Sequence, residues 1–307
     1  RNLKIERRII MLREATWSRV GTDVTGAQSI QEVLQKSGLD YEVVKTPLFL
    51  DNGYQVPGKF AIKKADEDKV FGIVGSDYTI CQNSDAFEFV NLIGEGLEFV
   101  RAGQTYHGLV YIIARLPEEY IMDDEIQPYV IFQNGHTGFT PVKAAIAPLR
   151  IVCQNQFSMA FKNAKASITI SHTKSLEDKM KNAKEVLITA ADYMNNFKNQ
   201  AEELYKKKLS RDVIDDLIEE LFPEPETPSI RQIEAVEEKR NRFFAAYNDE
   251  DNLNFRGTAW GLVNAYSDYL THLEPARKTE NWADNKFVQV TLNPAQMHSF
   301  VERVKAL

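Results

Sequence analysis

The sequence predicts an α+β fold: a mixed or mostly antiparallel sheet domain, followed by a helical domain that contains one long helix. Short runs of β-branched and aromatic residues, separated by turn residues, dominate the first half of the chain. After residue 173 the apolar residues instead recur every three or four positions, as they do in amphipathic helices. Because the strands follow one another as hairpins, a doubly wound nucleotide-binding fold is not expected.

The sheet domain is expected to span residues 1–173. Its strands are predicted at residues 41–50, 59–65, 70–81, 99–104, 109–117, 127–135 and 166–172. Its helices are predicted at residues 29–37, 85–99 and 152–163. Gly38 is placed to end the first of these helices, and Ser84 is placed to cap the second.

The helical domain is expected to span residues 174–307. Its first helix covers residues 175–209 without a glycine or proline, so it is long enough to be a packing spine, a dimerisation coil or a lever. Further helices are predicted at residues 210–222, 229–247, 258–273 and 293–306. The acidic, proline-rich segment at residues 223–228 is expected to be a rigid linker.

Composition is that of an ordinary globular protein and excludes several classes. The chain has 307 residues, 43% of them hydrophobic, and a formal net charge of −7. The two cysteines, Cys81 and Cys153, are too few for a disulfide framework and favour a reducing compartment. No apolar run reaches the length of a membrane helix, so no membrane partner is expected.

The common motifs of nucleotide-binding and hydrolytic enzymes are absent from the sequence. It has no P-loop, no dinucleotide-binding glycine pattern, no HExxH, no CxxC and no nucleophile elbow. The five histidines are scattered without metal-ligand spacing. No cofactor or metal is therefore predicted, and a non-enzymatic function is favoured.

Polar chemistry is densest in the segment QNGHTGFT, residues 133–140. Gly135 and Gly138 flank His136 and allow a tight backbone and the close approach of a ligand, with Asn134 beside them. His136 can be considered as a catalytic base, although no serine or cysteine nucleophile lies next to it in the sequence.

A second polar position follows in the segment APLRIVCQN. Arg150 lies there among apolar residues, where an arginine either pairs with a buried carboxylate or contacts a phosphate. Asn155 is expected to cap the helix that follows it, or to orient the loop.

A local excess of positive charge surrounds these segments. Between Thr140 and Leu187, eight lysines and arginines face three acidic residues, in a chain that is acidic as a whole. Such a stripe can follow a phosphate backbone, and nearby aromatic rings can stack on single-stranded bases. Alternatively, the lysines only solubilise a helix face and the aromatic residues belong to the core. The residues expected to contact nucleic acid are Lys143, Arg150, Lys162, Lys165, His136, Phe139 and Phe157.

Several segments together resemble the phage/plasmid-like protein family, a family of unknown function found on phages, prophages and plasmids. They are TWSRVG, DYTICQNSDAFEF, NGHTGFTPVKAAIAPLRIVCQN, SHTKS and FRGTAWGLVNAYSDYLTHL, between residues 16 and 273. Thr16 stands where the family usually has proline, and Ser171 where it often has arginine. The resemblance implies a mobile-element protein of the bacterial cytoplasm and supplies no established activity.

These observations lead to a nucleic-acid-associated protein that binds single-stranded DNA without hydrolysing nucleotides. The predicted order of three strands and a helix (residues 99–163) is also that of phage strand-annealing recombinases, which act as oligomeric rings. A homo-oligomer and a role in annealing are therefore expected. Two alternatives remain open: a protein-interaction module that acts on a host defence or replication protein, and an unrecognised enzyme centred on His136 and Arg150.

Overall fold

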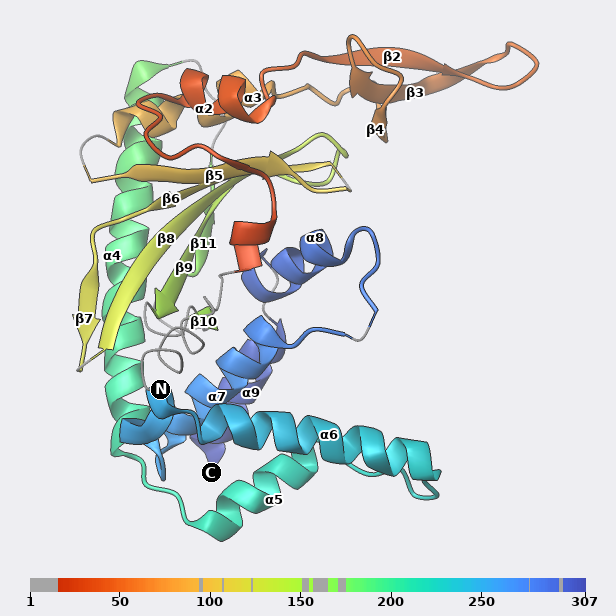
Figure 1. Cartoon of the computed structure of the whole chain (residues 1–307). Helices are drawn as coiled ribbons and strands as arrows, with labels where there is room; N and C mark the ends of the chain where they lie inside the picture. The colour runs from red at the N-terminus through yellow and green to blue at the C-terminus, as the bar shows by residue number, and fades with distance from the viewer. Residues whose placement is uncertain are drawn as a thin grey trace, which may run out of the picture.

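The computed structural model describes residues 16–93, 96–106, 108–122, 124–150, 155–156, 165–170, 175–275, 277–292 and 295–307. One large antiparallel sheet lies at the centre, a small three-stranded sheet projects from one end, and helices pack below and beside the large sheet (Figure 1). The fold is therefore α+β, as predicted. No helix within the described ranges is long and apolar enough to cross a membrane.

The large sheet has the strand order β1-β5-β6-β8-β9-β10, with β7 beside β8 and β11 beside β9. Its strands are β1 (Thr22–Asp23), β5 (Glu98–Gln104), β6 (Leu109–Arg115), β7 (Glu119–Ile121), β8 (Asp124–Gly135), β9 (Lys143–Arg150), β10 (Asn155–Gln156) and β11 (Ser167–Thr169). Strands β6, β8 and β9 form its centre, with Ile112 opposite Phe132 and Phe132 opposite Ala144.

One face of this sheet carries the main hydrophobic core. Because side chains alternate along a strand, Val110, Ile112, Val130 and Phe132 share this face and are fully buried. The face is covered by α2 (Ile30–Ser37), α3 (Asn83–Phe87) and the 3₁₀ helix η2 (Glu88–Leu92), together with the long helix α4 (Leu176–Lys206).

The opposite face of the sheet has a smaller apolar cluster. Tyr111, Ile113 and Ile131 lie there without solvent exposure. They pack with Phe287 of α8 (Trp282–Phe287) and with Val20, which follows the short helix η1 (Thr16–Arg19). The N-terminal η1 and the C-terminal α8 therefore lie together on this side of the sheet (Figure 1).

The small sheet consists of β2 (Val43–Phe49), β3 (Gln55–Lys64) and β4 (Val70–Gly75), paired in that order. Val43, Ile62 and Val74 form its own buried cluster. The hairpin of β2 and β3 extends away from the rest of the molecule (Figure 1). Its turn contains Gly53 at a φ of 79°, in the left-handed region that favours glycine.

The C-terminal half is helical. Helix α4 has 31 residues and buries a stripe that includes Ala190, Phe197 and Leu204, so it acts as a packing spine. The other elements are α5 (Arg211–Leu221), α6 (Ile230–Tyr247), η3 (Glu250–Phe255), α7 (Ala259–His272), α8, the π-helical turn η4 (Val288–Leu292) and α9 (Ala295–Ala306). The main hydrophobic cluster runs without a break from the sheet through α4 to α7 and α9.

Most predicted elements are confirmed within a few residues. The predicted helix over 85–99 is wrong: a five-residue α3 passes into the 3₁₀ turn η2, and β5 already begins at Glu98. Ser84 does not cap α3 either, because the helix begins at Asn83 with Gln82 as its N-cap. The strand predicted at residues 99–104 is confirmed as β5, which pairs with both β1 and β6. The predicted helix over 152–163 lies mostly outside the described residues, and the described part of it, β10, is a strand paired with β9.

Candidate functional site

The segment that carries the densest polar chemistry, residues 133–140, forms the end of β8 and the loop toward β9. Asn134 is buried and its side-chain Nδ2 donates hydrogen bonds to the Cys81 carbonyl (3.3 Å) and to Asn83 Oδ1 (3.0 Å). The backbone N–H of Gly135 donates to Asn134 Oδ1 (2.9 Å). The loop is therefore anchored to α3 through two asparagines.

His136 extends the same network and is fully buried. Its Nε2 lies 3.0 Å from Asn83 Oδ1, and an amide oxygen only accepts, so the His136 proton is on Nε2. The His136 ring also contacts the rings of Tyr41 and Phe71 at centroid distances of 6.3 and 5.5 Å. Burial lowers the pKa of His136 to about 4, because charging the ring would cost its desolvation.

The glycines of this loop admit the small sheet. Gly138 has a φ of 89°, and a Cβ there would lie 2.7 Å from Val74 Cγ1 on β4. Gly72, also on β4, approaches the loop so closely that its Cβ would lie 2.7 Å from the Thr137 carbonyl oxygen. The tight backbone predicted from the glycines is present, and what approaches it closely is the protein's own β4.

His136 is therefore placed differently from the surface contact that the sequence suggested. A side chain with 0% exposure does not reach a nucleic acid on the surface in this conformation. Its Nδ1 has no hydrogen-bond partner among the described residues. Its visible role is to hold the junction between the two sheets.

Three of the predicted contact residues do face solvent. Phe139 at the tip of the loop is 89% exposed. Lys143 begins β9, where it is half-buried opposite Gln133 on β8 and Thr169 on β11. Lys165 is exposed just before β11 and lies beside the same edge of β9, about 13 Å further along the strand.

The remaining predicted residues are only partly described. Arg150 ends β9, with Ile126 and Asn155 as its neighbours in the sheet, but its side chain lies outside the described part. Asn155 belongs to β10. Lys162 and Phe157 lie outside the described residues. The structure thus brings Phe139, Lys143 and Lys165 to one region and separates His136 from them by burial.

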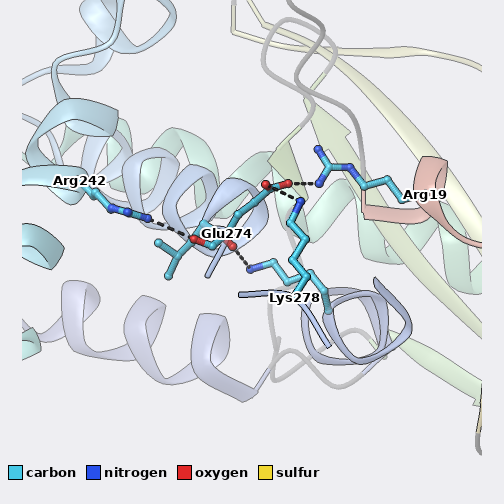
Figure 2. Close-up of polar contacts among 6 residues, drawn as sticks. Arg19, Arg242, Glu274 and Lys278 are labelled. Atoms are coloured by element: carbon cyan, nitrogen blue, oxygen red, sulfur yellow. Dashed lines mark hydrogen bonds and ion pairs between the residues drawn. The ribbon is translucent and has the colours of Figure 1, made fainter. Parts of the chain in front are cut away.

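The structure also assembles a basic cluster that the sequence did not reveal. Arg19 of η1 and Lys278 both form ion pairs with the Glu274 carboxylate, the latter at 2.7 Å (Figure 2). Arg242 of α6 approaches from the other side and donates to the Glu274 carbonyl at 3.4 Å (Figure 2). Lys286 of α8 donates to the Leu273 carbonyl at 3.2 Å. We call Arg19, Arg242, Glu274, Lys278 and Lys286 the Glu274 cluster.

The electrostatics of the Glu274 cluster follow from two cations at the Glu274 carboxylate and two more at the neighbouring backbone carbonyls. Hydrogen bonds from Lys278 and Arg19 hold the pKa of Glu274 below its usual range. Partial burial lowers the pKa of Lys286 to about 8; the charge of Arg19 adds to this and that of Glu274 opposes it. The carbonyls that Arg242 and Lys286 contact lie at the C-terminal end of α7, where the helix dipole favours cations.

An aromatic ring completes this region. Lys278 Nζ lies 4.6 Å from the ring centroid of Trp282, and the Arg19 guanidinium carbon lies 5.8 Å from it. Asp284, two residues further along α8, accepts a hydrogen bond from the backbone N–H of Tyr106 at 2.7 Å. The Tyr106 side chain is 65% exposed, so this region presents an exposed aromatic ring as well as basic groups.

No local signal pointed to the Glu274 cluster. Arg19 and Glu274 are 255 residues apart in the chain, and only the packing of η1 against α8 joins them. Within the described ranges no group of histidine, cysteine, aspartate and glutamate side chains is arranged to hold a metal ion.

A comparison with protein families places the chain. Residues 70–304 match the family described as Domain of unknown function (DUF932), which is more than half of the sequence. The chain belongs to the DUF932 family. No curated protein and no solved structure gives a significant match.

The DUF932 match begins at β4 and ends in α9. It includes the His136 loop, Lys143, Lys165 and every member of the Glu274 cluster except Arg19. Arg19 and the β2–β3 hairpin precede it. The DUF932 region therefore contains the His136 loop and the strand β4 that packs on it. It does not contain Arg19, which is one of the four basic residues of the Glu274 cluster.

Proposed function

We propose that this protein is encoded by a phage or plasmid and binds single-stranded DNA, without hydrolysing nucleotides. The observation that carries the proposal is the exposed Phe139 ring at the tip of the β8–β9 loop, with Lys143 at the start of β9 and Lys165 about 13 Å further along that strand. Neither lysine forms an ion pair with a carboxylate of the described residues. Both are therefore available to phosphates.

The combination suits single strands for two physical reasons. Unstacked bases expose their faces, and stacking on an aromatic side chain contributes about 1–3 kcal/mol per base. Lysines that neutralise phosphates release condensed counterions, so the logarithm of the affinity falls with the logarithm of salt by about 0.7 for each phosphate contacted. The Phe139 ring can stack on one base while Lys143 and Lys165, about 13 Å apart along β9, contact phosphates of neighbouring nucleotides.

The phage or plasmid origin is supported by the sequence segments quoted above. Membership of the DUF932 family does not by itself imply such an origin. The annealing role rests only on the strand and helix order predicted from the sequence; in the structure β9 and β10 follow β8 in the same sheet, so the described residues lend it no support. Annealing requires many contacts along a strand, so a homo-oligomer belongs to the same proposal.

The proposal is tested by fluorescence anisotropy with labelled single- and double-stranded oligonucleotides at several salt concentrations. We expect tighter binding to the single strand, and a salt slope about 0.7 smaller in Lys143→Ala and in Lys165→Ala. Lys239→Ala is the matched control, because Lys239 is exposed on α6 among acidic residues. Binding that is indifferent to salt, or equal losses in the control, would overturn the proposal.

Phe139 provides a second arm of the test. Phe139→Ala removes about 1–3 kcal/mol of stacking and leaves the thermal stability unchanged, since the ring is 89% exposed. Tyr54→Ala is its control, because Tyr54 is 59% exposed on the distant turn between β2 and β3. Equal affinity of Phe139→Ala and the unmodified protein would remove the ring from the interface.

One observation favours the alternative, a protein-interaction module. Ile230, at the start of α6, is 76% exposed directly after the acidic segment at residues 223–228. The carboxylates of that segment, Glu224 and Glu226, repel phosphates, so a partner of this surface is expected to be a protein rather than DNA. A host protein that co-purifies after nuclease treatment, and is lost in Ile230→Asp, would support this alternative.

A further inference from the structure

The Glu274 cluster contains more positive charge than the role of a helix cap requires. Lys286 and Arg242 already satisfy the carbonyls of Leu273 and Glu274 at the end of α7. Arg19 and Lys278 are additional, and both converge on the carboxylate of the same residue. A carboxylate held by an arginine and a lysine occupies the position in which such groups commonly bind a phosphate.

We propose that the Glu274 cluster is a phosphate-binding subsite in which the Glu274 carboxylate holds the anion position until a phosphate group displaces it. The subsite rests on the proposed function in one respect: the phosphate is that of a single-stranded DNA backbone. Its chemistry is nevertheless independent of the DNA, because free pyrophosphate presents the same group.

Access supports displacement. The side chains of Arg19, Glu274 and Lys278 are 38%, 37% and 46% exposed, so an anion reaches them from solvent without opening the core. Ion pairs at such exposed positions are worth only about 0.2–1 kcal/mol each. A phosphate offers three acceptor oxygens and more charge than a carboxylate, so it competes effectively for the same donors.

The neighbouring carboxylates do not fill the same role. Glu238 pairs with Arg242 on α6, and Asp284 accepts the backbone N–H of Tyr106. Glu274 is the residue to which both Arg19 and Lys278 bind. Neutralising Glu274 alone therefore removes two ion pairs of the cluster at once, whereas neutralising Glu238 or Asp284 removes neither of them.

Trp282 supplies a direct signal. The Lys278 ammonium lies 4.6 Å from its ring centroid, so a phosphate that draws Lys278 away changes the surroundings of the indole. The chain has two other tryptophans, Trp17 and Trp260. A Trp282→Phe variant identifies which part of the fluorescence change belongs to the cluster.

The test compares three proteins: the unmodified chain, Glu274→Gln and Glu280→Gln. Each is titrated with inorganic phosphate, with pyrophosphate and with a labelled oligothymidine. Glu280 is the matched control because it is exposed in the same segment and forms no ion pair with a described residue. In Glu274→Gln a phosphate no longer has to displace two exposed ion pairs, so we expect this variant to bind pyrophosphate about three- to tenfold more tightly than the unmodified chain. Binding should change the Trp282 fluorescence. Glu280→Gln should bind pyrophosphate with the affinity of the unmodified chain.

Equal pyrophosphate affinity in Glu274→Gln and Glu280→Gln would overturn the subsite, whatever the oligothymidine result. Enhanced pyrophosphate binding without any oligothymidine binding would keep the subsite and remove the DNA proposal. If Glu274→Gln does not fold, Lys278→Gln decides instead: weaker pyrophosphate binding than the unmodified chain supports the subsite, and unchanged binding overturns it.

Discussion

Acidification is expected to destabilise the fold through His136. The pKa of this histidine is 6.5 in its ordinary state and about 4 in the folded protein. Between these values the unfolded chain binds a proton that the folded chain does not, so stability rises with pH across this window. The contribution of His136 is complete above pH 6.5 and is lost as the pH falls toward 4. Between pH 7.5 and pH 4.5 the loss is about 2.5 kcal/mol.

The measurement is urea unfolding of the unmodified protein and of His136→Gln across this pH range. Carboxylates titrate in both proteins, so the difference between their free energies of unfolding isolates the histidine. The variant is the less stable protein at pH 7.5, and the difference should shrink by about 2.5 kcal/mol at pH 4.5. His298→Gln, at a half-buried histidine of α9, should retain the His136 contribution. A difference between the unmodified protein and His136→Gln that does not change with pH would refute the reasoning.

Three further changes test the packing. Gly72→Ala should lower the free energy of unfolding in urea by about 1–3 kcal/mol, because its Cβ would meet the loop backbone at 2.7 Å. Gly75→Ala on the same strand is the control: its Cβ would meet nothing within 4 Å, so the free energy of unfolding should change by less than about 0.5 kcal/mol. Thr258→Ala should cost about 1–2 kcal/mol, since Thr258 Oγ1 caps α7 at the Gly261 N–H, and Thr258→Ser should restore most of it. Gly261→Ala should lower the melting temperature more than either, because its Cβ would clash with the Phe255 carbonyl oxygen.

Local patterns were sufficient where an element is defined by its own residues. Helix α2 ends at Gly38 with a φ of 66°, as the sequence predicted, and it begins after Ser29, whose side chain accepts the Glu32 N–H. Strand β9 was not predicted, although it pairs with three strands. Its sequence KAAIAPLR is rich in alanine and contains proline, so its strand conformation depends on β8 and on β11. Partners distant in sequence, rather than propensity, decide such a segment.

For the candidate site, too, the sequence predicted the local backbone but not the tertiary contacts. The glycines around His136 correctly predicted a tight backbone, since Gly138 has a φ of 89°. The sequence did not show that β4 approaches that backbone, because Val74 of β4 precedes Gly138 by 64 residues. Whether a polar residue faces a ligand or a neighbouring sheet depends on tertiary packing. Phe139 and His136, three residues apart, illustrate this: one side chain is 89% exposed and the other is fully buried.

The position of Arg19 connects the overall charge of the chain to its local chemistry. An acidic protein can still bind phosphate, because at physiological salt a charge is screened beyond about 8 Å and only the nearest groups act. Those groups must be brought together, and Arg19 reaches Glu274 only while the segment after η1 stays on the sheet. Arg101 of β5 holds it there by donating hydrogen bonds to the carbonyls of Val20 (2.8 Å) and Gly21 (2.9 Å). The positive charge that Arg19 adds near Glu274 therefore depends on the attachment of the N-terminal segment to β5. These basic residues are brought together by the fold and not by a basic stretch of sequence.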